Sequence, residues 1–128
     1  MLRVERVDLD HGFLVIVGDG ELRYSDFMTL WDDLRARPEW GSLNKLYDLT
    51  NCSTLLWTDD IGCLVDREHG EADLFPGRRV AVVSEVAVTF GMARMFQMRG
   101  ESDRNYELEV FRSIAAATAW LNEVIAAQ

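Results

Sequence analysis

The fold of this chain is decided by residues 79–99, which read RVAVVSEVAVTFGMARMFQMR. Residues 79–83 form a nearly continuous apolar run, typical of a strand that is buried on both faces of a sheet. In the segment from Val86 to Arg99 a stripe of apolar residues recurs at three- and four-residue spacing (Val88, Met92, Met95 and Phe96), and Gly100 follows, so this part predicts a helix and its end. A buried strand followed at once by a helix is the building unit of a parallel sheet covered by helices.

The same alternation extends in both directions from this unit. Toward the N-terminus the pattern predicts strands at 2–9, 13–17 and 45–49, a turn at 10–12, and helices from Ser25 to near Arg37 and from about Thr58. Toward the C-terminus it predicts a half-exposed strand at 106–110 and a helix that begins after Ser113. The expected order is therefore ββαβαβαβα. It corresponds to an α/β sandwich in one domain over residues 1–128, with a five-stranded, mainly parallel mixed sheet and about four helices.

Composition and charge exclude several classes of function. Aspartate and glutamate number 22 against 13 lysines and arginines, so a net charge of −9 opposes binding to nucleic acid. The longest aliphatic and aromatic run, Phe13 to Val17, is far too short to span a membrane, and no secretory leader is recognisable. Two cysteines do not make the disulfide framework of a secreted domain. We expect a cytoplasmic protein with no membrane span.

Residues suited to catalysis or metal binding are few. Cys52, Cys63, His11 and His69 lack the close paired spacing of metal ligands, so we expect no metal site. A Cys–His nucleophile would need one of these cysteines to meet a histidine across the fold. The chain has no phosphate-binding loop, dinucleotide-binding fingerprint or nucleophile elbow. We therefore predict no cofactor, no catalytic residue and no enzymatic activity.

Several short motifs, in their order along the chain, support a family resemblance. They are LYDL (46–49), RRVAVV (78–83), GMARMF (91–96), VFR (110–112) and AWL (119–121). With these motifs the chain resembles the STAS-like family of bacterial proteins, which are related to the stage-II-sporulation type of anti-sigma-factor antagonist. The resemblance covers nearly the whole chain. It implies a compact α/β module that binds a partner protein or a small ligand, without catalytic machinery.

The resemblance also implies a candidate phosphorylation site. In phosphorylated antagonists an aspartate–serine pair begins the helix after the central strand, and the serine accepts the phosphate. The corresponding stretch here, LWTDDIG (56–62), lacks that pair, so the candidate acceptors are Thr58, at the helix start, and Ser53. In the alternative interpretation Thr58 only caps the helix, while Asp59 and Asp60 complement the helix dipole.

The helix at 86–99 has more apolar residues than one face can bury. This surplus of methionine and phenylalanine predicts either an adaptable contact surface, including one for a homodimer, or additional core. Together with the acidic helix start, it gives the candidate partner-binding residues Asp59, Asp60, Phe90, Met92, Met95 and Met98. Ligands of parallel sheets bind beyond the carboxyl ends of the strands. That rule gives the candidate ligand-binding residues Trp57, Thr58, Ser84, Glu85 and Phe90.

Negative charge is concentrated between Asp59 and Asp73, where six acidic residues accompany a single base, Arg67. We expect this segment to be a solvated face, or a docking site for a basic partner. The leading hypothesis is a regulatory module, in the manner of an anti-sigma-factor antagonist, that contacts an unidentified protein. The alternative is a carrier or sensor of a small apolar or amphipathic ligand in a cleft near Trp57 and Phe90.

Overall fold

The computed structural model describes residues 1–8, 10–41, 43–70 and 78–126. Within these ranges the chain forms β1 (Leu2–Asp8), β2 (Phe13–Gly18), β3 (Gly20–Leu22), α1 (Tyr24–Arg35), η1 (Pro38–Trp40), β4 (Asn44–Asp48), β5 (Cys52–Thr54), α2 (Thr58–Gly70), β6 (Arg79–Val83), α3 (Ala87–Gly100), η3 (Glu101–Asp103), β7 (Glu107–Phe111) and α4 (Ile114–Ala126). The main sheet has five strands in the order β1-β2-β4-β6-β7. Only β1 is antiparallel to its neighbour. The predicted α/β fold with a mainly parallel sheet is confirmed.

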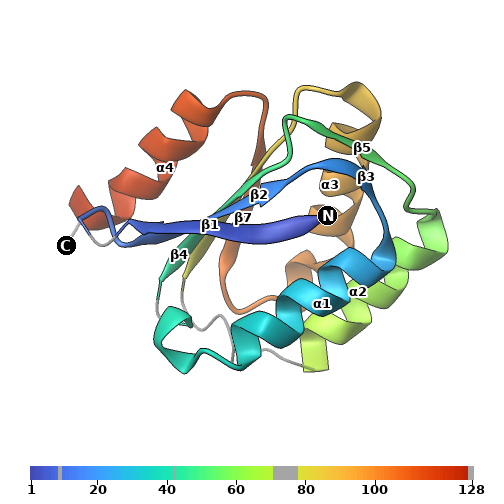
Figure 1. Ribbon diagram of the computed structural model, residues 1–128, viewed down its shortest axis with the longest axis horizontal. Helices are drawn as coiled ribbons and strands as arrows, with labels where there is room; N and C mark the ends of the chain where they lie inside the picture. Colours follow the sequence, from blue (N-terminus) through green and yellow to red (C-terminus); the bar gives the residue numbers. More distant parts are fainter. Residues whose placement is uncertain (9, 42, 71–77, 127–128) are drawn as a thin grey trace.

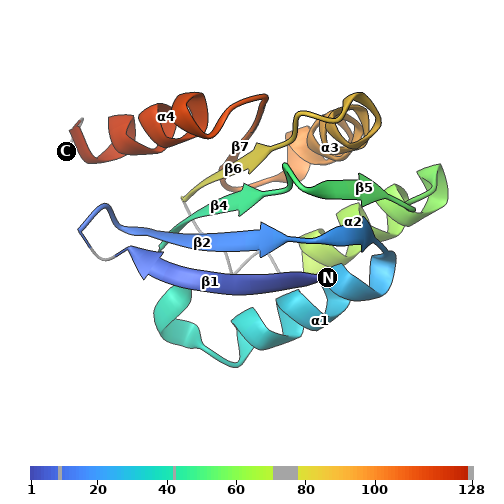
Figure 2. The ribbon, with the colours of Figure 1, turned by 45° about the horizontal axis from the view of Figure 1, so that its top comes forward.

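Helices cover both faces of this sheet. Figure 1 shows α4 on the opposite side of the sheet from α1 and α2, and Figure 2 gives a second view of these layers. Successive strand residues point to opposite faces, so Val15 of β2 and Ala81 of β6 pack against α4. Ile16 and Val80 belong to the larger core cluster, which also contains residues of α1 and α2 and is packed against by residues of α3. Among the described residues, the buried apolar side chains therefore form a hydrophobic cluster on each side of the sheet.

A second, two-stranded sheet was not predicted. Residues 50–54 read as a polar connection, but Cys52–Thr54 pairs in parallel with Gly20–Leu22. Gly18, just before β3, allows the close approach: a Cβ atom at this position would lie 2.4 Å from the Cys52 Sγ. Gly20 has a φ of +71°, a backbone conformation that favours glycine. These two short strands extend the fold beyond the ends of β2 and β4, as Figure 2 shows.

Element boundaries agree with the sequence pattern to within two residues. The helix predicted from Ser25 begins at Tyr24, because the Asp26 carboxylate accepts a 2.8 Å hydrogen bond from the backbone N–H of Arg23 and caps this end. It ends at Arg35, and Pro38 begins the short helix η1. The Ser113 Oγ accepts a 3.1 Å hydrogen bond from the backbone of α4 and caps its start as predicted.

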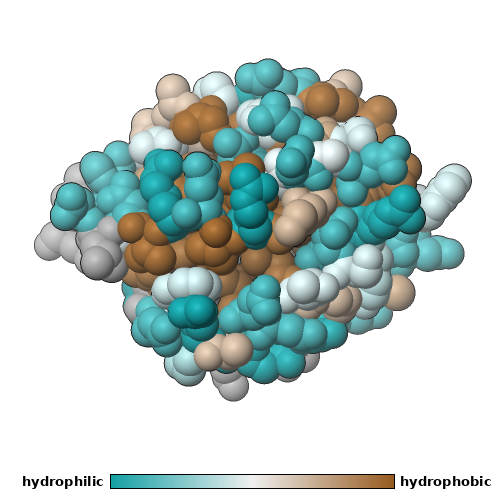
Figure 3. All heavy atoms as spheres, in the orientation of Figure 1, coloured by the Kyte–Doolittle hydropathy of each residue, from teal (hydrophilic) through white to brown (hydrophobic). Residues whose placement is uncertain are grey.

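The molecular surface is mostly hydrophilic in the view of Figure 3, but hydrophobic residues reach it below the edge strand β1. Val4 and Val7 of this strand are only partly buried and pack against the larger core cluster. Across the ranges that the structure describes, no helix has both the length and the apolarity that a membrane crossing requires.

Candidate functional site

The interior contains a cavity of about 70 Å³, which we call the central cavity. It lies between the sheet and the three helices α1, α2 and α3. Most of its wall is apolar, including Leu22, Phe27, Leu49, Ile61, Leu64 and Phe96. Protein interiors rarely contain voids larger than a water molecule, and an apolar cavity does not hold water well. The central cavity is therefore suited to an apolar group.

Helix α2 forms one wall of the central cavity. Its cavity-lining residues Ile61, Leu64 and Glu68 are three and four positions apart, which places them on one helical face. The helix packs mainly against α3 and more lightly against α1. Helix α2 therefore contributes both apolar side chains and one buried acidic group to the wall of the central cavity.

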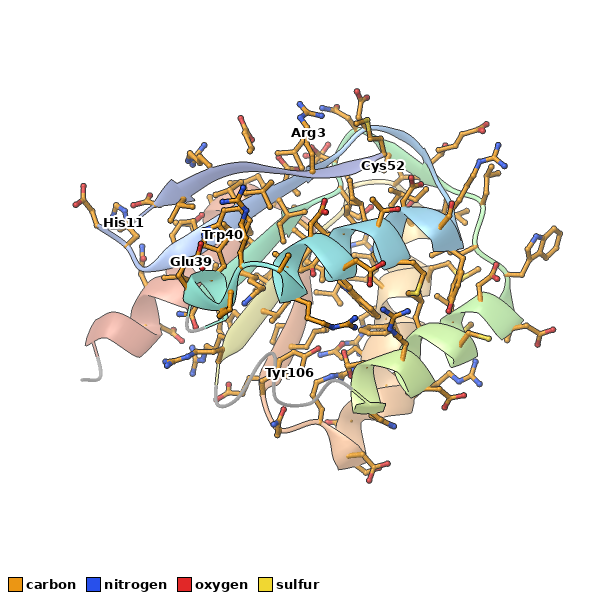
Figure 4. All side chains as sticks on the ribbon, turned by 60° about the horizontal axis from the view of Figure 1, so that its bottom comes forward. Arg3, His11, Glu39, Trp40, Cys52 and Tyr106 are labelled. Atoms are coloured by element: carbon orange, nitrogen blue, oxygen red, sulfur yellow. The ribbon has the colours of Figure 1, made fainter. Side chains whose placement is uncertain are left out.

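Glu68 belongs to a buried group of charged and aromatic side chains. The Arg104 Nε donates to the Glu68 Oε1 at 2.9 Å, and these side chains are only 3% and 4% exposed. The Tyr106 hydroxyl donates to the other carboxylate oxygen of Glu68. Figure 4 places Tyr106 beside the C-terminal end of α2. A carboxylate removed from water needs such partners, since an unpaired buried charge is strongly destabilising.

Arg104 is held by more than its ion pair. Its guanidinium also donates to the backbone oxygens of Gln97, at 2.9 Å, and Phe96, at 3.3 Å. It lies 5.1 Å from the ring centre of Phe96 and 5.5 Å from that of Tyr106. With its donors engaged in this way, Arg104 neutralises Glu68 and acts as a fixed support for one side of the central cavity.

Tyr47, in β4, adds a second phenol to the cavity wall. The Trp31 Nε1 donates to the Tyr47 hydroxyl oxygen at 3.3 Å. Burial, and then the nearby charge of Glu68, raise the pKa of Tyr47 well above its usual value. Burial and the charge of Glu68 likewise raise the pKa of Tyr106. Both phenols therefore keep their protons at neutral pH and can donate. We call Tyr47, Glu68, Arg104 and Tyr106 the buried polar cluster.

The candidate phosphorylation sites lie outside the central cavity. Thr58 and Ser53 are exposed. The Thr58 carbonyl accepts a 3.1 Å hydrogen bond from the Arg99 Nη1. Asp60 caps the start of α2, because its carboxylate accepts a 2.8 Å hydrogen bond from the backbone N–H of Trp57. Asp59 is exposed.

The candidate partner residues of α3 are divided between interior and surface. Met92 lines the central cavity. Met95 is half-buried and packs against the larger core cluster. Phe90 is also half-buried, with the guanidinium of Arg112 at 4.0 Å from its ring centre. Met98 is 64% exposed. Of these four side chains, Met98 has the exposure that a contact surface needs.

The predicted ligand cleft is not where the cavity lies. Trp57 is 78% exposed. Ser84 is fully buried and its hydroxyl donates to the backbone oxygen of Val86 at 3.3 Å, while Glu85 is exposed. Like Thr58 and Phe90, these three residues are absent from the wall of the central cavity. The wall of the central cavity is instead formed by side chains of the sheet and of α1, α2 and α3.

Sequence reasoning missed the buried polar cluster. It assigned Glu68 to a solvated acidic segment, and this was wrong, because the side chain is 4% exposed and ion-paired. The residues at 71 and 73 of that segment lie outside the described residues. One signal was present in the sequence: Glu68 follows Ile61, Leu64 and Val65 at a position of the apolar helical stripe.

One of the Cys–His pairs that a nucleophile would need is not formed. His11, in the β1–β2 hairpin, and Cys52, in β5, lie far apart (Figure 4). Cys52 is buried and Cys63 is exposed. Burial raises the pKa of the Cys52 thiol to about 11. Among the described residues, no three His, Cys, Asp or Glu side chains are grouped as metal ligands.

Comparison with known proteins supports the fold. No protein-family model matches this chain, and no curated protein matches its sequence. The sheet and helices define a domain with a SpoIIAA-like α/β fold. A similar solved structure is that of an uncharacterized protein of the DUF3478 family, with a SpoIIAA-like fold, from Shewanella loihica PV-4. It is 18% identical, with a TM-score of 0.59 over 94% of this chain and 92% of that one. The predicted resemblance to the stage-II-sporulation type of fold is confirmed at the level of fold.

Proposed function

We propose that this protein is a non-enzymatic binding module that holds a small apolar or amphipathic ligand in the central cavity. The supporting observation is an apolar cavity of about 70 Å³, surrounded by three helices and the sheet and bordered by a few buried polar groups. Ligand sites are typically built in this way, from apolar walls with a small number of placed polar groups.

The energy of the empty cavity favours an occupant. Cavities in protein cores cost roughly 24 cal/mol per Å³. A volume of 70 Å³ therefore corresponds to about 1.7 kcal/mol of lost packing in the unoccupied protein. A ligand that fills this space restores those contacts and raises the stability of the folded state.

Native mass spectrometry of the gently purified protein tests this function first. We expect an additional non-covalent mass that is lost on unfolding. The ligand-free protein is then melted under increasing pressure of xenon, a small apolar probe, and its melting temperature should rise with dissolved xenon concentration. Absence of a bound mass, together with a melting temperature unaffected by xenon, would refute the proposal.

A second candidate function, contact with a partner protein, is favoured by the exposure of Trp57, at 78%. Such a large exposed aromatic residue is typical of a contact hot spot. Exposed Asp59 adjoins it, and Met98 belongs to α3, which packs against α2. Phosphorylation of exposed Thr58 or Ser53 would add charge of about −1.5 to −2 beside this surface and alter such a contact.

Site-specific photo-crosslinking in the native cell tests partner contact. A photoreactive residue at position 57 should crosslink one defined protein or a second copy of this chain. The matched control places the same photoreactive residue at exposed Glu85, which lies in the connection between β6 and α3. Equal crosslinking from both positions would contradict a specific contact at Trp57.

A further inference from the structure

The buried polar cluster restricts the chemistry of a ligand in the central cavity. Tyr47 and Glu68 both line the cavity, and the charge of Glu68 acts on Tyr47. The Tyr47 hydroxyl accepts from Trp31. Within the part of the chain that the structure describes, its own proton is not donated to any protein acceptor. A buried donor without an acceptor is energetically costly, so an occupant that accepts this proton is favoured.

Glu68 provides a hydrogen-bond acceptor at the same cavity. Its carboxylate accepts one hydrogen bond from Arg104 and one from Tyr106. A carboxylate provides about four lone-pair sites, so it retains capacity for a further donor. The protein therefore presents one donor, on Tyr47, and one acceptor, on Glu68, at the same cavity.

The charges around the cavity exclude an ionic ligand group. A carboxylate or phosphate would lie near the charge of Glu68 at low dielectric, where like charges repel strongly. Arg104 cannot compensate, because its donors bind Glu68 and two backbone oxygens. An ammonium group would add a buried charge beside an ion pair that is already neutral, with an unrecovered desolvation cost.

We infer that the central cavity selects a neutral alcohol, whose hydroxyl accepts from Tyr47 and donates to Glu68 while its hydrocarbon part occupies the apolar wall. This inference rests on the proposed ligand-binding function and specifies its ligand. The volume also limits the size. The cavity is about half of the roughly 150 Å³ that accommodates benzene, so a short alkyl chain fits without displacement of helices.

The test compares ethanol, acetate and xenon, which are all smaller than benzene, at neutral pH by NMR titration. Trp31 provides the reporter, because its indole N–H donates to Tyr47 and its resonance is assigned with the variant Trp31→Phe. We expect ethanol to shift this resonance and to bind at least tenfold more tightly than acetate. Tyr47→Phe should weaken ethanol binding by about tenfold and leave xenon binding unchanged, since it removes only the hydroxyl.

Tyr24→Phe is the matched control, because Tyr24 lies at the start of α1 and outside the cavity wall. It should alter the affinity for neither probe. Equal binding of acetate and ethanol, or unchanged ethanol binding in Tyr47→Phe, would overturn the selection of an alcohol while xenon binding upholds the cavity site. No binding of any of the three probes would overturn the proposed function, and this inference with it.

Discussion

Filling the central cavity from within the protein should stabilise it and prevent ligand binding. Ala93 of α3 lines the cavity, and leucine retains a strong helix preference. Ala93→Leu adds a side chain to a space of about 70 Å³. At roughly 24 cal/mol per Å³, complete filling raises the free energy of unfolding by up to about 1.7 kcal/mol.

The expected change in melting temperature follows from the size of the chain. Unfolding entropy is about 2.1 cal/mol/K per residue, which for 128 residues gives roughly 0.27 kcal/mol/K. A gain of about 1.7 kcal/mol therefore raises the melting temperature by about 6 °C. Differential scanning calorimetry measures this shift, and a repeat with xenon measures the loss of ligand stabilisation.

The control for this prediction is Ala115→Leu, on the exposed side of α4. It adds the same side chain away from the central cavity and should move the melting temperature by less than about 2 °C. A lower melting temperature for Ala93→Leu, combined with unchanged stabilisation by xenon, would refute the cavity and the reasoning built on it.

Three further predictions concern the buried groups. Arg104→Ala should lower the free energy of unfolding by about 3–5 kcal/mol in urea denaturation, because it leaves Glu68 charged and buried; a loss below about 1 kcal/mol would contradict the buried pair. Burial, and then the charge of Arg78, lower the pKa of Lys45 from 10.5 to about 8. The charged form of Lys45 therefore destabilises the folded state at neutral pH. This destabilisation is lost as the pH rises through 8 toward 10.5, because the folded protein then releases the proton while the unfolded chain still holds it. The stability of the wild type relative to Lys45→Met should therefore increase by about 2 kcal/mol between about pH 7.5 and 9.5, and a pH-independent difference would refute the lowered pKa. A thiol reagent at pH 8 should label exposed Cys63 rapidly and buried Cys52 only after unfolding; two fast thiols would contradict the burial of Cys52.

Most of the fold could be predicted because its elements are local. The apolar run at 79–83 and the helical spacing of the next segment depend on residues that are neighbours in sequence. Right-handed crossovers between parallel strands then leave few arrangements, and the five-stranded sheet is one of them. The pairing of β3 with β5 was missed because strands of three residues are too short to show a periodic pattern.

The candidate site was predicted less well, for a physical reason. Trp57 and Phe90 were selected by their place near the ends of strands, whereas burial depends on which elements pack above them. Trp57 is exposed, and Phe90 is covered by Arg112. In the sequence Glu68 is one acidic residue among several. Its burial is possible only because Arg104 and Tyr106, which follow α3 in the chain, bind its carboxylate in the folded protein.

The sequence by itself determined the order of the helices and of the main-sheet strands, the mainly parallel sheet and the negative charge, because periodicity, turns and composition are written along the chain. The tertiary structure alone decided where space remains and which polar groups border it. The central cavity is formed by side chains from α1, α2, α3 and the sheet, which are far apart in sequence. A void is defined by the distances between such elements, and no local pattern specifies those distances.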